Sequence, residues 1–143
     1  MLLSGIVATY LSVLSVEDIK KRKVRMLLLY LGVGIVVGGL FLYRSPTIIE
    51  RVVGGGIGLV FLLITWVTKG GIGLADGILV LYLGVLYGYL PCLTILLIAS
   101  IACSICCMLM IGFRLVTRKA RIPYIPFLLI GYLCYFIAGR SYV

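Results

Sequence analysis

Six apolar stretches, separated by short polar or glycine-rich connections, follow one another along this chain of 143 residues. They cover residues 2–16, 26–43, 48–67, 77–90, 91–113 and 122–138. A helix needs about 20 apolar residues to cross a bilayer, and several of these stretches are nearer 15, which implies tilt or local thinning of the membrane. One helix from 77 to 113 would be too long, so we expect a tight turn in the sequence GYLP at 88–91. The pattern predicts an all-α integral membrane protein with about six transmembrane helices.

The composition supports a membrane location for the whole chain. Hydrophobic residues make up 64% of it, against about 45–50% in soluble domains, and the mean hydropathy is +1.29. A net charge of +9 would suggest nucleic acid in a soluble chain, but these cations lie between apolar stretches, so we expect lipid and no nucleic acid as a partner. Basic residues do not precede the first apolar stretch, which favours a retained helix over a secretory signal. We expect a single transmembrane domain over residues 1–143.

The basic residues also predict an orientation. Ten of the thirteen fall in alternate connections, at 20–25, 69 and 114–121, whereas only Arg44, Arg51 and Arg140 fall on the opposite side. Because cytoplasmic loops carry the excess of Lys and Arg, the first group should be cytoplasmic and both termini outside.

The chain has only two aspartates, Asp18 and Asp76, and each stands where an apolar stretch meets a polar connection. Under the predicted orientation both lie at the cytoplasmic face. Acids beside a transmembrane segment are candidates for function because placing them there is costly. Two neighbouring carboxylates can share a proton, so that one activates water while the other polarises a carbonyl. The plain alternative is two interfacial acids that stabilise helix ends.

The surroundings of these acids resemble the motifs of a known family. Residues 15–19 (SVEDI), followed by basic residues, are similar to the first aspartate motif of the type IV prepilin peptidases, which are GxGD-type membrane aspartic proteases. Residues 71–77 (GIGLADG) resemble the second aspartate motif, and residues 122–128 (IPYIPFL) resemble the element that begins the last span. The order and spacing of the three motifs cover nearly the whole chain.

Four departures from the family pattern leave both acids in place. Residues 24–26 read VRM where the family often has IPN, and Ala75 precedes the second aspartate where glycine is usual. Ile78 replaces a frequent lysine, and Ile125 replaces the glycine of the third motif. These changes leave room for an altered specificity or an inactive relative.

The resemblance implies an endopeptidase of the inner (plasma) membrane. Such an enzyme removes the leader from type IV pilin-like precursors at the cytoplasmic face, with Asp18 and Asp76 as the catalytic residues and without metal or cofactor. Larger members carry a cysteine-rich cytoplasmic region and also methylate the product. This chain shows no such region, so we expect peptidase activity without methylation.

The sequence lacks the residues that several other functions require. Cys103, Cys106 and Cys107 share a helix face, but the chain has no His and no fourth clustered thiol to complete a zinc site. Residues 70–73 (GGIG) lack the Lys-Ser/Thr ending of a phosphate loop. A lipid phosphotransferase would need more acids to hold its metal ions. The main alternative is a non-enzymatic protein, either a small transporter or a pilus-assembly scaffold.

Overall fold

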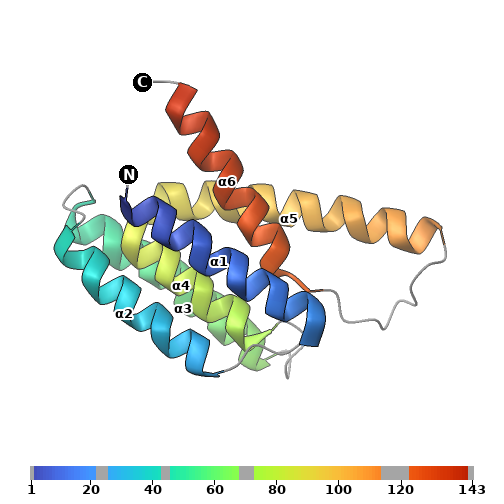
Figure 1. Cartoon of the computed structure of the whole chain (residues 1–143), viewed down its shortest axis with the longest axis horizontal. Coiled ribbons are helices and arrows are strands. Elements are labelled where there is room, and N and C mark those ends of the chain that lie inside the picture. The colour runs from blue at the N-terminus through green and yellow to red at the C-terminus, as the bar shows by residue number, and fades with distance from the viewer. Residues whose placement is uncertain (1, 22–25, 43–45, 68–72, 114–122, 142–143) are drawn as a thin grey trace.

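The computed structural model describes residues 2–21, 26–42, 46–67, 73–113 and 123–141, and this part of the chain is helical, without strands. The helices are α1 (Leu2–Lys21), α2 (Met26–Leu42), α3 (Ile48–Val67), α4 (Leu74–Tyr87), α5 (Tyr89–Gly112) and α6 (Ile125–Ser141). The all-α class and the number of helices expected from the sequence are confirmed (Figure 1).

Several helix boundaries differ from those expected, by up to five residues. Helix α4 spans Leu74–Tyr87 instead of 77–90, α5 begins at Tyr89 instead of 91, and α6 ends at Ser141 instead of 138. Helix α1 continues to Lys21 instead of ending at residue 16, because its buried side chains recur at helical spacing through Leu14 to Asp18. Helix α6 begins at Ile125, three residues later than expected. Pro126 then falls in its first turn, where the missing N–H of proline breaks no helical hydrogen bond.

The turn expected at 88–91 is confirmed and is shorter than predicted. Gly88 alone separates α4 from α5, with a φ of +85° that only glycine adopts without strain. Its N–H donates to the carbonyl of Gly84 and so closes the last turn of α4. The chain reverses at this point, and α5 runs back past the start of α4 and beyond the rest of the bundle (Figure 1).

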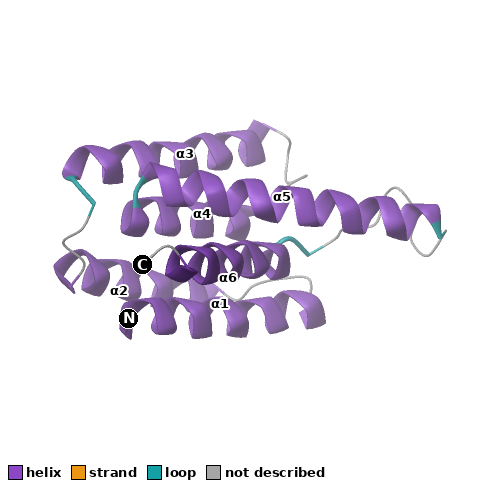
Figure 2. Ribbon diagram, turned by 90° about the horizontal axis from the view of Figure 1, so that it is seen from above, coloured by secondary structure: helices purple, strands orange, loops and turns teal. Residues whose placement is uncertain are grey.

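Helix α4 is the centre of the molecule. It packs against α2, α3 and α5, and more than half of its residues are buried (Figure 2). The core joins side chains of α1, α4, α5 and α6 in one apolar cluster, to which Leu11 and Leu14 of α1 and Leu79 and Leu83 of α4 belong. A 14-residue helix thus holds its acid-bearing first turn inside the bundle.

Glycines allow α3 to lie directly on α4. A Cβ added to Gly54 would lie 2.8 Å from the carbonyl carbon of Gly84, and one added to Gly58 would lie 2.6 Å from the backbone nitrogen of Leu81. Either Cβ would therefore force the two helix backbones apart. Gly54 and Gly58 thus form a small-xxx-small pair that permits the close packing of α3 on α4.

Two helices of the described chain, α3 and α5, are long and apolar enough to cross a membrane. Helices α2, α4 and α6 contain shorter apolar segments. The number of crossings and their orientation therefore stay predictions. Most of the basic residues on which the orientation depends, at 22–25, 69 and 114–121, lie outside the described residues.

Candidate functional site

Buried polarity is concentrated at one end of the helical bundle. Among the described residues, the buried polar or charged side chains are Ser15, Asp18, Thr65 and Asp76. They belong to the last turns of α1 and α3 and to the first turn of α4, and these three helix ends lie at the same end of the molecule (Figure 1). The rest of the core is apolar, so this end is the place where the fold can hold charge in a shielded environment.

Asp18 lies in the last turn of α1, on the side of the helix that faces the core. It follows Leu14 by four residues and Leu11 by seven, which places the three on one helical face. Leu11 and Leu14 are almost completely buried, and Asp18 is 9% exposed. The extension of α1 beyond its expected end is thus what carries this carboxylate into the bundle instead of leaving it in a connection.

Asp76 is the third residue of α4 and is 7% exposed. Gly73 caps this helix from an extended conformation, and its carbonyl accepts the N–H groups of Asp76 and Gly77, at 3.0 and 3.4 Å. Helix α4 begins at Leu74, three residues earlier than the expected apolar stretch, so that Asp76 lies inside its first turn. The capping position itself belongs to Gly73.

The glycines on either side of Asp76 have separate steric roles. A Cβ on Gly73 would lie 2.8 Å from Oδ2 of Asp76, so the bare glycine leaves the room that the carboxylate occupies. A Cβ on Gly77 would lie 2.8 Å from a methyl group of Leu62, so this glycine lets the first turn of α4 settle against α3. The remainder of the glycine motif, Gly71 and Ile72, lies outside the described residues.

Tyr124, which immediately precedes α6, lies within electrostatic range of Asp76, and the sequence did not assign it to the site. Its hydroxyl lies 3.3 Å from that of Ser100 on α5. Burial raises the pKa of Tyr124, and the nearby groups of Cys103 and Asp76 raise it further, whereas the hydrogen bond with Ser100 lowers it. The hydroxyl therefore stays protonated near neutral pH and can donate a hydrogen bond. An aromatic residue in the third motif was the available signal, but only the fold brings it to Asp76.

The cysteines of α5 do not form a recognisable metal site. Cys103 and Cys107 bring their sulfurs to 3.9 Å of each other, with Cys106 one residue before Cys107. The described residues contain no group of three or more His, Cys, Asp or Glu side chains placed to hold a metal ion. Cys92 is buried, and its thiol contacts the carbonyl of Val80 at 3.7 Å, as expected of a packing residue.

The fold and the site together define a helical protein in which two buried carboxylates, from helices far apart in the sequence, are brought to the same end of the bundle. A family model described as the type IV leader peptidase family matches residues 5–108, which include both acids. The chain belongs to this family of membrane-associated proteases, as the resemblance of its motifs predicted. The third motif, at 122–128, lies beyond the matched region. Comparisons with curated proteins and with solved structures gave no significant match.

Proposed function

We propose that this protein is a membrane aspartic endopeptidase that removes the leader from type IV pilin-like precursors, with Asp18 and Asp76 as its catalytic pair. The observation that carries the proposal is the burial of both aspartates at one end of a bundle that is otherwise apolar. Family membership supports a peptidase. The residue types support acid–base chemistry, since the chain offers no histidine to act as a base.

The two helix ends favour different roles for the two acids. Asp76 lies in the first turn of α4, where the helix dipole stabilises negative charge, and Asp18 lies in the last turn of α1, where the dipole disfavours it. In our proposal Asp76 is the ionised partner that takes a proton from the attacking water. Asp18 is the protonated partner that donates to the scissile carbonyl. Carboxylates whose environments differ in this way can divide acid and base work between them.

Tyr124 adds a third polar group to this scheme. Its protonated hydroxyl lies near Asp76 and is hydrogen-bonded to Ser100. We assign it a positioning role, in which it orients Asp76 or the bound water. It is held at the start of α6, so a shift of α6 would alter the geometry of the site.

The proposed location of the acids supports a precursor protein with an apolar helix as the substrate. In the proposed orientation they lie at the cytoplasmic face of the plasma membrane, beside helices that can hold an apolar partner in lipid. A precursor with a polar leader followed by an apolar helix would present its cleavage site at this level. Pilin-like precursors have this form, and the family resemblance points to them.

Co-expression with a candidate precursor tests the function. The host should lack other peptidases of this family, and precursor mass should be followed over time. We expect loss of the leader at a single bond near the start of the apolar helix, without methylation of the new N-terminus. A correctly inserted protein that leaves a panel of such precursors intact would favour the non-enzymatic scaffold or transporter instead.

A further inference from the structure

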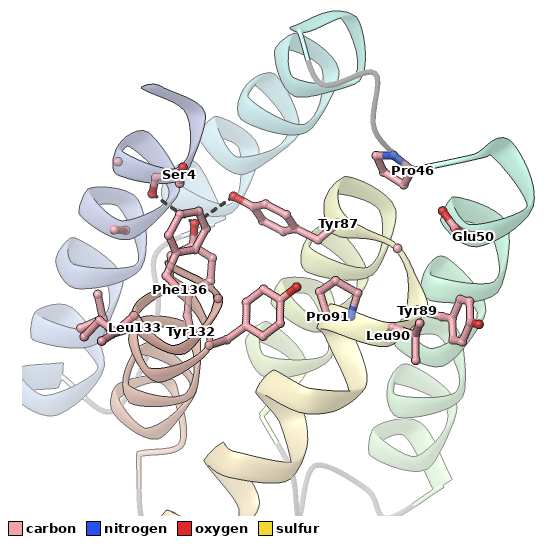
Figure 3. A pocket seen from close by; sticks show the side chains of 16 residues that line it. Ser4, Pro46, Glu50, Tyr87, Tyr89, Leu90, Pro91, Tyr132, Leu133 and Phe136 are labelled. Carbon is pink, nitrogen blue, oxygen red and sulfur yellow. Dashed lines mark hydrogen bonds between the residues drawn. The ribbon is translucent and has the colours of Figure 1, made fainter. Parts of the chain in front are cut away.

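A large pocket opens at the end of the bundle opposite to the aspartates. It has a volume of about 870 Å³ and lies between the first turns of α1, the second half of α6 and the junction of α4 with α5 (Figure 3). Pro46 and Glu50, at the start of α3, complete it. Pockets of about 300–1,000 Å³ hold small organic ligands in proteins. The peptidase mechanism makes no use of this space.

Aromatic rings form one wall of the pocket. The rings of Tyr87 and Tyr132 lie 5.9 Å apart, and those of Tyr132 and Phe136 lie 5.5 Å apart, both in tilted arrangements. The Tyr132 hydroxyl donates to the carbonyl of Ser4 at 3.1 Å, so the 2.8 Å bond between the two tyrosines takes its proton from Tyr87. This chain of bonds ties α4, α6 and α1 together and fixes the rings. Tyr87 and Tyr132 are themselves almost completely buried, at 7% and 1% exposed, so they support the wall from behind.

The opposite side of the pocket carries a carboxylate. Glu50 is the only charged residue that lines the pocket among the residues whose side chains are described. Its Oε2 accepts the N–H of Thr47 at 2.9 Å, which holds the side chain at the helix start. A Cβ added to Gly88 would lie 3.3 Å from Cβ of Glu50, so this side chain rests against the α4–α5 junction. In Figure 3, Glu50 and Pro46 face the row of Tyr87, Tyr132 and Phe136 across the pocket.

We propose that this pocket binds an amphiphile with an apolar body and a cationic head, an amine or a quaternary ammonium. The partly exposed rings of Tyr89, Tyr135 and Phe136, which line the pocket, offer contact area for the body and can attract a cation, and Glu50 supplies the opposite charge. An anionic head would be repelled by Glu50, and a neutral one would gain only the apolar contacts. The source of such a cation is either the headgroup of an amine-bearing membrane lipid or a free amphiphile.

Binding of three probes of similar size tests the proposal. Hexyltrimethylammonium, its neutral isostere 2,2-dimethyloctane and hexyl sulfate should be titrated into the intact protein in uncharged detergent, with ligand-observed NMR as the readout. We expect the cation to bind at least tenfold more tightly than the anion and more tightly than the isostere. Equal binding of all three probes would overturn the proposal and leave an apolar crevice.

Two variants locate the binding site. Glu50→Gln retains an oxygen that can accept the Thr47 N–H, so the fold should persist while cation binding weakens about tenfold or more. Ala8→Leu, on the pocket wall contributed by α1, should weaken binding of the cation and of the isostere alike. Glu17→Gln, near the opposite end of α1, is the control and should leave binding unchanged. Undiminished cation binding in Glu50→Gln would contradict the proposal.

The source of the ligand is tested in nanodiscs. If phosphatidylethanolamine discs suppress binding of the cationic probe relative to phosphatidylglycerol discs, the occupant is a membrane lipid. If binding is equal in the two discs, a free amphiphile is the ligand. Failure of the probe to bind in either disc, with the protein folded, would overturn the proposal. None of these readouts depends on cleavage of a precursor, so they stand apart from the peptidase assignment.

Discussion

At the scale of single residues, the absence of a Cβ on Gly73 leaves the space that the Asp76 carboxylate occupies. Gly73 has a φ of −65° and a ψ of +133°, a conformation open to any residue, so its backbone does not require glycine. The steric reason is the carboxylate, because a methyl group at this position would lie 2.8 Å from Oδ2. Glycine is therefore required at position 73 by the space that the Asp76 side chain needs, and not by the backbone conformation of the turn.

Gly73→Ala should lower the rate of precursor cleavage at least tenfold, because the carboxylate must rotate away from its place. Stability should fall by no more than about 1 kcal/mol, the size of a lost helix cap. Cleavage rate and thermal unfolding should be measured on the same membrane preparation. Gly73→Ser adds a capping side chain together with a Cβ, so its cleavage rate should be equally impaired.

Gly34→Ala is the control for this experiment, since a Cβ at Gly34 would meet nothing within 4 Å. It should cleave at the parental rate. If Gly73→Ala also cleaves at that rate, the steric link between Gly73 and Asp76 is wrong.

At the scale of elements, the contact between α3 and α4 holds the first turn of α4 in place. Gly54 and Gly58 remove the side chains that would separate the two helices, and Gly77 continues the same contact to the acid-bearing turn. The position of Asp76 therefore depends on packing that extends along α4 away from the site.

Gly58→Ala should destabilise the protein by about 1–3 kcal/mol, the usual cost of overpacking, because the added methyl group meets the backbone of Leu81. Gly56→Ala is the matched control in the same helix, where a Cβ would meet nothing within 4 Å, and it should change stability by less than about 0.5 kcal/mol. Thermal unfolding in one detergent measures both. Equal stability of the two variants would show that the helices do not approach as closely as described.

The sequence predicted the helices well and their ends less well. Hydrophobic stretches marked all six helices, and the GYLP sequence marked the turn at Gly88. The predicted end of α1 is wrong, because the change from apolar to charged residues at position 17 does not end the helix. Charged residues at 17, 18, 20 and 21 extend α1, and only tertiary packing shows that Asp18 is on its buried face.

At the scale of the whole molecule, the unequal lengths of α4 and α5 affect the depth of the site. At 1.5 Å per residue, the 14 residues of α4 extend about 21 Å and the 24 residues of α5 about 36 Å from their shared junction. Helix α5 therefore reaches well past Asp76. If the shared junction at Gly88 lies at the outer face, Asp76 at the other end of α4 lies deeper in the membrane than the cytoplasmic end of α5, and water and substrate must reach it between helices.

The predicted orientation can be measured with reporter fusions. Fusions after residues 45, 70, 90 and 118 should report outside, cytoplasm, outside and cytoplasm in turn, because the basic excess falls in alternate connections. A reporter active in the opposite compartment serves as the control for each fusion. A cytoplasmic signal after residue 45 together with an external one after residue 70 would reverse the orientation.

The sequence alone predicted part of the candidate site. Its acids stood out in the sequence as the only two aspartates, and the even number of predicted crossings between them placed both at one face. Neither their burial nor the nearness of Tyr124 to Asp76 could be predicted, because both depend on contacts between α1, α4, α5 and α6. The pocket near Glu50 was missed for the same reason, since its lining comes from five helices and the connection before α3.

The catalytic pair is tested most directly by replacing each aspartate with its neutral amide. Asp18→Asn and Asp76→Asn should each abolish leader cleavage while membrane abundance and binding of the uncut precursor persist. The double variant should be no worse than either single one, as expected for groups that act as a unit. Glu17→Gln, beside Asp18 in the sequence, should retain substantial activity. If either asparagine variant processes the precursor at near the parental rate, in a host without other such peptidases, the two-aspartate account is wrong.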